Sequence, residues 1–193
     1  MEKILMDSLS SIALEFKTNE LAYLALTSKI EQPLRDRWAF VLHRKLQKDI
    51  IVSREWLRTD IALITNQEPI ALIELKAMYT FDATSAKSLS SFVQDMEKDE
   101  SKAKNLASKS VEIYTILLAT HPKSIIPIRF EQIVKYAPGI NNAIRKFKDA
   151  DSVREVAINE VNDKFVGKNV IASGNINGGK AFNVYADCII LDY

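Results

Sequence analysis

Apolar positions change their spacing along this chain, and each change predicts a different element. Between residues 58 and 81, two apolar, β-prone runs flank the polar connection 66–69, which is typical of a β-hairpin. Residues 31–46 carry apolar side chains at helical spacing, and Pro33 suits the first turn of a helix. A second helical stripe covers 89–106, and the apolar run 111–120 is long enough for a buried central strand.

The remaining patterns complete an alternation of helices and strands. They predict helices over 2–17, 19–26, 130–136 and 152–165, a strand over 49–56, and a C-terminal hairpin formed by 169–173 and 181–193 around a Gly/Asn-rich loop, 174–180. This order favours an α/β fold in which a mixed central β-sheet is flanked by helices, with N-terminal helices and a C-terminal hairpin. Because no Pro/Gly/Ser-rich linker interrupts the chain, we expect one domain over 1–193, with a helical part (1–47), a core (48–121), and C-terminal helices and hairpin (122–193).

Three ionisable residues, Asp60, Glu74 and Lys76, interrupt the apolar runs of the central hairpin. Charges in such a setting are costly unless they are paired or bind a metal. If the hairpin is centred on Gln67, Asp60 and Glu74 face each other with β-carbons roughly 4.5–5.5 Å apart, and Lys76 projects from the same face. A connection with an even number of residues would place the two acids on opposite faces and abolish the site.

This arrangement resembles the PD-(D/E)xK nuclease superfamily, whose best-known members are type II restriction endonucleases. Asp60 matches the first acid of the motif, Glu74 the second and Lys76 the lysine, with Leu75 as the intervening residue. Thr59 replaces the proline of the motif, at a position that varies within the superfamily. The resemblance covers roughly 31–118 and implies a restriction-endonuclease-like core and a nuclease that acts on DNA, of the kind used in restriction or mobile-element defence.

The resemblance also implies roles for these residues. Asp60, Glu74 and Lys76 would be catalytic. The two carboxylates and the main-chain carbonyl of Leu75 would hold Mg²⁺ or Mn²⁺, ions that prefer oxygen ligands. Glu31 has two interpretations. It could form a capping box with Ser28, which the spacing slightly favours, or it could be the helical glutamate that reaches the metal in many members of the superfamily.

Charge is distributed unevenly along a chain whose net charge is only +1. Residues 35–58 contain seven basic residues against three acids, whereas 82–100 contain five acids against two lysines. A basic flank before the proposed site is typical of phosphate binding, and we predict phosphate contacts from Arg54, Arg58 and Lys87. An ordinary solvated helix face accounts for the same basic residues equally well.

Three other interpretations of the hairpin charges stay open. Lys76 could neutralise Glu74 while Asp60 pairs with Arg58 or caps a turn, which is a common fate of strand charges. The chain could also be a nucleic-acid-binding module that does not cut, or a protein-interaction domain with an incidental ion pair.

Composition excludes several other classes of protein. Hydrophobic residues make up 47% of the 193 residues, but no apolar run approaches the length of a membrane span. The acidic N-terminus lacks a secretory pattern, so we expect a cytoplasmic protein without a membrane partner. Cys188 is the single cysteine, which leaves no internal disulfide and no Cys/His cluster for zinc. An oligomer is compatible with the sequence, but no dimer signal is visible.

Overall fold

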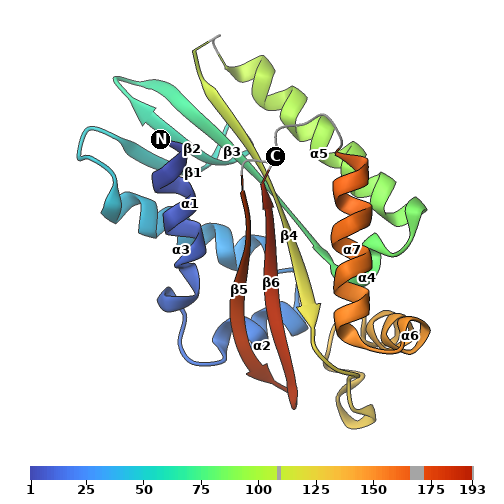
Figure 1. Cartoon of the computed structure of the whole chain (residues 1–193). Helices are drawn as coiled ribbons and strands as arrows, with labels where there is room; N and C mark the ends of the chain where they lie inside the picture. The colour runs from blue at the N-terminus through green and yellow to red at the C-terminus, as the bar shows by residue number, and fades with distance from the viewer. Residues whose placement is uncertain (108–109, 166–171, 193) are drawn as a thin grey trace.

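The computed structural model describes residues 1–107, 110–165 and 172–192, and its centre is a six-stranded mixed sheet (Figure 1). The strands are β1 (Ile51–Trp56), β2 (Thr59–Thr65), β3 (Glu68–Tyr79), β4 (Glu112–Pro122), β5 (Ala172–Ala181) and β6 (Val184–Asp192). They are ordered β1-β2-β3-β4-β6-β5. The central pair, β3 and β4, is parallel, and every other neighbouring pair is antiparallel.

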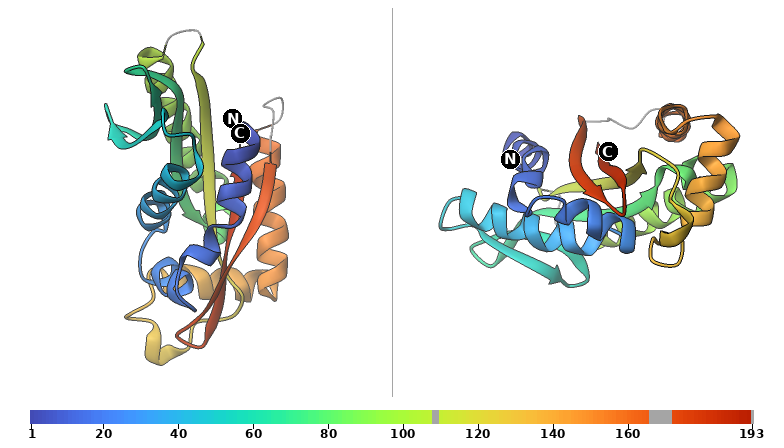
Figure 2. Two further views of the ribbon diagram at one scale, coloured as in Figure 1. Left: turned by 90° about the vertical axis from the view of Figure 1, so that its left-hand side faces the viewer. Right: turned by 90° about the horizontal axis from the view of Figure 1, so that it is seen from below.

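Helices cover both faces of this sheet. They are α1 (Glu2–Ser10), α2 (Glu20–Thr27), α3 (Glu31–Lys45), α4 (Thr80–Ala83), α5 (Ala86–Leu106), α6 (Ala137–Phe147) and α7 (Ala150–Lys164), with short 3₁₀ turns at Ile12–Glu15 and Ile128–Phe130. In Figure 1, α1 and α3 lie on the left of the molecule, near β1 and β2, and α5 and α7 lie on the right; the view from below in Figure 2 also shows α1 and α3 apart from α6 and α7. The predicted α/β fold with a mixed, helix-flanked sheet is therefore confirmed at this level.

Side-chain alternation along the central strands explains the two layers. Ile73 and Leu75 pack with Trp38 of α3 in one buried cluster, while Leu117 of β4 packs with Met96 of α5 in another. Successive strand residues point to opposite faces. Glu74 and Lys76 point to the same face as Met78, which packs with Met96 of α5. Asp60 shares this face, because its neighbour Ile61 pairs with Ile73 and Asp60 therefore lies opposite Glu74.

The central hairpin has the predicted register around Asp60 and Glu74, but its turn differs from the predicted one. Its turn is the two-residue pair Asn66 and Gln67, both with positive φ (49° and 67°), so the hairpin is not centred on Gln67. Near the turn, Ile64 pairs with Pro69. The register then shifts by one residue, so that Ile61 pairs with Ile73. A β-bulge at Ile70 thus compensates for the even connection and returns Asp60 and Glu74 to one face.

Three other predicted elements are wrong. The predicted helix over 2–17 is divided into α1 and a 3₁₀ turn. No helix covers 130–136; instead α6 begins at Ala137, with Pro138 in its first turn, where a missing N–H is tolerated. The predicted loop 174–180 belongs to β5, and the hairpin turns at Phe182 and Asn183, both with positive φ. Residues 169–171 of the predicted strand lie outside the described residues.

No helix within the described ranges is both long and apolar enough to cross a membrane.

Candidate functional site

The C-terminal half of β3 extends beyond its partner β2, which begins at Thr59. Backbone N–H groups on this open side need other acceptors, and three carboxylates supply them. Leu75 N donates to Asp60 Oδ2 (2.8 Å), Ala77 N to Glu31 Oε2 (3.0 Å) and Tyr79 N to Asp82 Oδ2 (2.9 Å). We call Asp60, Glu31 and Asp82 the carboxylate edge of β3. It gathers acids from β2, α3 and α4 along one strand.

Glu74 is on β3 itself and points to the face of the sheet that α5 covers, with only 7% of its surface exposed. Burial, followed by the negative charges of Asp60 and Asp99, raises the pKa of Glu74 to about 8. Within the described residues Glu74 forms no ion pair. Asp60 and Glu74 are therefore neighbouring carboxyl groups whose combined charge is incompletely compensated, as the predicted register requires.

These two acids suit a divalent cation, because a cation between them would relieve both their repulsion and the burial of charge. No group of three or more His, Cys, Asp or Glu side chains in the described part of the chain is arranged to hold a metal ion. Asp60, Glu74 and a main-chain oxygen are a smaller set of oxygen ligands that could hold such an ion.

Leu75 is placed to provide that oxygen. Its N–H points at Asp60, and in an extended strand the N–H and C=O of one residue point to the same side. The Leu75 carbonyl therefore faces the carboxylate edge.

Lys76 is on the predicted face but contacts neither Asp60 nor Glu74. Its ammonium lies 2.8 Å from Asp99 Oδ2 on α5, and Asp99 Oδ1 in turn accepts from Lys102 at 2.7 Å. Burial alone would lower the pKa of Lys76, but the hydrogen bond and charge of Asp99, followed by the charge of Glu31, raise it. Lys76 is therefore a fixed cation between α5 and the carboxylate edge.

Glu31 does not form the capping box with Ser28 that its spacing slightly favours, because no side chain caps the N-terminus of α3 and the Ser28 hydroxyl bonds Leu24 O. Glu31 instead reaches Ala77, 46 residues away. Burial and the charge of Asp60 raise its pKa, against the opposing effects of Lys76 and the Ala77 N–H. The second interpretation, a helical glutamate directed at the site, agrees with this position.

Arg35 is a site residue that the sequence pattern did not reveal. It is 7% exposed, and its guanidinium contacts Asp60 Oδ1 (3.3 Å), Asp36 Oδ1 (3.0 Å) and Glu55. Asp99 was also missed. Two signals could have identified them: Arg35 follows Glu31 by one helical turn, and Asp99 interrupts the apolar stripe of α5 between Met96 and Ala103.

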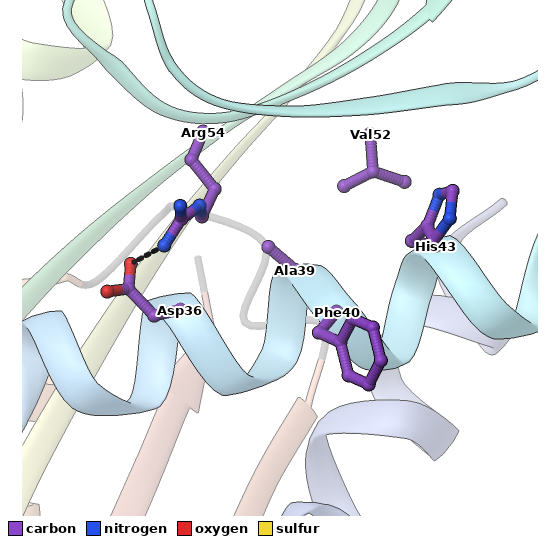
Figure 3. A pocket seen from close by; sticks show the side chains of 6 residues that line it. All are labelled: Asp36, Ala39, Phe40, His43, Val52 and Arg54. Atoms are coloured by element: carbon purple, nitrogen blue, oxygen red, sulfur yellow. Dashed lines mark ion pairs between the residues drawn. The ribbon is translucent and has the colours of Figure 1, made fainter.

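The three residues predicted to contact phosphate lie in different parts of the structure. Arg54 pairs with Asp36 at 3.1 Å and lines a shallow hollow of about 360 Å³ between α3 and β1 (Figure 3), so it connects to Asp60 through Asp36 and Arg35. Arg58 is exposed on the β1–β2 turn, with φ 73°. Lys87, at the start of α5, is about 18 Å along the helix from Asp99. Lys87 is therefore far from the part of α5 that holds Lys76.

Comparisons of the chain with protein-family models, with curated proteins and with solved structures found no match.

Proposed function

We propose that this protein is a Mg²⁺- or Mn²⁺-dependent nuclease that hydrolyses phosphodiester bonds in DNA, on a core that resembles restriction endonucleases. The observation that carries the proposal is the pair Asp60 and Glu74. Two adjacent carboxyl groups, one of them buried with a pKa near 8 and without an ion pair among the described residues, form a site with a deficit of positive charge.

Asp60, Glu74 and the carbonyl of Leu75 would hold the ion, and Glu31 lies on the same edge of β3. Carboxylate and carbonyl oxygens are the ligands that Mg²⁺ and Mn²⁺ prefer. Asp60 Oδ2 already accepts from Leu75, and Oδ1 faces Arg35. Each carboxylate oxygen has two lone pairs, so both remain able to bind a cation.

Hydrolysis requires that a water oxygen bonds to phosphorus while one P–O ester bond breaks; the attacking water loses a proton and the leaving oxygen gains one. A bound Mg²⁺ or Mn²⁺ supplies a water of lowered pKa and neutralises part of the phosphate charge. Lys76, held by Asp99, presents a fixed ammonium to stabilise the negative charge that develops on the phosphate or to orient the attacking water.

Nicking of supercoiled plasmid in Mn²⁺ tests this function. We expect wild-type protein to nick and Asp60→Asn, Glu74→Gln and Lys76→Met to be slower by about 10²-fold or more, the loss seen when one group that stabilises the transition state is removed. Glu68→Gln is the matched control, because Glu68 is an exposed acid at the other end of β3. Nicking that persists unchanged in all three site variants would remove the assignment.

A second candidate is a nucleic-acid-binding module that does not cut. It is favoured by the carboxylate edge itself, because Asp60, Glu31 and Asp82 all accept backbone N–H groups and so have a structural role without any metal. DNA binding in EDTA, with no nicking in Mg²⁺ or Mn²⁺ and no Mn²⁺-induced rise in melting temperature, would support this candidate over the nuclease.

A further inference from the structure

Residues 123–148 form the most one-sidedly basic part of the chain. This segment includes the loop after β4, the 3₁₀ turn at Ile128–Phe130 and helix α6. It contains a single acid, Glu131. Its basic residues are Lys123, Arg129, Lys135, Arg145, Lys146 and Lys148.

These cations differ from those of 35–58 in how they are compensated. In 35–58 four of the seven basic residues are paired within the protein: besides Arg35 and Arg54, Arg37 pairs with Glu20 (3.6 Å) and Arg44 with Glu15 (2.6 Å). Three basic residues of this segment, Lys45, Lys48 and Arg58, form no ion pair with any described residue. In 123–148, Lys123 pairs with Asp187 (2.7 Å), and no other ion pair is formed with any described residue. The larger surplus of available positive charge therefore lies here, although the whole chain has a net charge of only +1.

The segment is also held in a defined shape. The buried side chain of Asn141 bonds both the N–H and the C=O of Ile126 (2.7 and 3.1 Å). Asn141 Nδ2 further donates to Glu131 at 3.0 Å, so the one acid is tied to the interior side of α6. Farther along this helix, Arg145 and Lys146 are exposed. A surface ordered in advance loses less conformational entropy when it binds a partner.

The segment adjoins the strand that carries the candidate site. The Tyr136 ring packs edge-on against Tyr79 at 5.4 Å between centroids, where β3 ends, and Figure 1 shows the loop and α6 at this end of the molecule, next to α4. Tyr79 follows Glu74 by five residues, about 17 Å along the strand. This distance corresponds to about five nucleotides at 3.4 Å per step.

We propose that the surface formed by 123–148 is the main phosphate-binding surface for nucleic acid, contacting the backbone on one side of the bond placed at Asp60 and Glu74. The inference rests on the proposed function for the class of partner. Uncompensated Lys and Arg side chains supply the sequence-independent attraction to phosphates. Tyr136, 43% exposed beside Lys135, adds an aromatic ring at the end nearest the site.

The test measures binding in EDTA, so that cleavage plays no part. Fluorescence anisotropy with a labelled DNA duplex of about 20 base pairs compares wild-type protein with Arg145→Glu/Lys146→Glu. We expect the affinity to fall about tenfold or more at 0.1 M salt. The slope of log K against log salt concentration should decrease in magnitude by about two, which corresponds to the loss of about two phosphate contacts. Arg145→Gln/Lys146→Gln should weaken binding to a smaller extent, since it removes charge without adding repulsion.

The matched control is Lys45→Glu/Lys48→Glu, which makes the same charge change at two exposed lysines of 35–58. Its affinity should stay within about twofold of wild type. Equal losses in both double variants, no loss in Arg145→Glu/Lys146→Glu, or wild-type binding to anionic phospholipid vesicles but not to DNA would each overturn the proposal. Circular dichroism shows whether every variant is folded.

This outcome can be separated from that of the proposed nuclease. DNA binding that depends on Arg145 and Lys146, in a protein that never nicks plasmid, supports the surface and refutes the nuclease. Nicking that depends on Asp60 and Glu74 but is indifferent to the α6 variants supports the nuclease and refutes the surface.

Discussion

Arg35 Nη1 lies 3.3 Å from Asp60 Oδ1, the longest of the three carboxylate contacts that this guanidinium makes. The same arginine is shared with Asp36 and Glu55, so it compensates Asp60 only in part. Arg35 thus lies beside Asp60, where the metal ion proposed above would bind, and it would compete with that ion.

Replacing Arg35 by glutamine should destabilise the protein and strengthen metal binding. Removing one partner of a buried ion pair costs about 3 kcal/mol or more, and loss of the guanidinium leaves Asp60 free for a divalent ion. We expect a lower melting temperature without metal and a larger Mn²⁺-induced rise than in wild type. Differential scanning fluorimetry across a Mn²⁺ series measures both.

Arg37→Gln is the control for this substitution, because Arg37 lies on the same helix but pairs with Glu20 at the surface. Its response to Mn²⁺ should match that of wild type. A smaller Mn²⁺ effect in Arg35→Gln than in wild type would contradict competition at Asp60.

Glu74 should make stability fall as pH rises. Its pKa is about 8 in the folded protein, against 4.5 for an ordinary glutamate, so the folded state holds this proton more tightly than the unfolded state does. The associated stability is fully present below pH 4.5 and is lost as pH rises to about 8. Glu74→Gln lacks this loss, and its free energy of unfolding relative to wild type should rise by about 2–4 kcal/mol between pH 5 and pH 8.

Urea denaturation of both proteins at several pH values measures this difference. A saturating concentration of Mn²⁺ at pH 8 should stabilise wild type and not Glu74→Gln, since the variant lacks a ligand. A constant difference between the two proteins from pH 5 to pH 8 would show that Glu74 does not titrate in this range.

His121 should produce the opposite pH dependence. The ring is buried, Nδ1 lies 3.2 Å from Thr80 Oγ1, and Nε2 has no partner among the described residues. Burial, followed by the charge of Arg154, lowers its pKa from 6.5 to about 4, although Asp187 and Asp151 act in the other direction. Stability associated with neutral His121 is therefore present above pH 6.5 and is lost as pH falls toward 4.

His121→Gln tests this dependence, because glutamine is neutral throughout. The free energy of unfolding of wild type relative to the variant should fall by about 2–3 kcal/mol between pH 7 and pH 4. Chemical denaturation monitored by circular dichroism gives the values. An unchanged difference across this range would mean that the ring takes up its proton without cost to the fold.

Gln67→Gly should stabilise the central hairpin. Gln67 adopts φ 67° in the two-residue turn, a left-handed conformation that glycine adopts without a Cβ clash and that favours Asn-Gly in such turns. We expect a gain of about 0.5–1 kcal/mol in the free energy of unfolding. Gln67→Val, with a branched Cβ, should lose stability at the same position, and a stabilising valine would contradict the turn geometry.

Much of the fold could be predicted because it depends on local patterns. The apolar runs on either side of residues 66–69 determine a hairpin, and the alternation of side chains places Asp60, Glu74 and Lys76 on one face. The predicted turn is wrong, but Asp60 and Glu74 still share a face because the bulge at Ile70 restores the register. Pro69 has no N–H for the ladder, and proline is common at bulges, which is a local reason for that irregularity.

The sequence by itself therefore determined the layers of this protein and the two strands that carry its acids. Only the tertiary structure decided that Glu31 reaches Ala77, that Lys76 is held by Asp99, and that Arg35 stands beside Asp60. It also decided which basic segment keeps the larger number of unpaired cations. The physical reason is that these contacts join residues 23 to 46 positions apart, and side-chain periodicity specifies which face of an element is buried but not which distant charge will meet it.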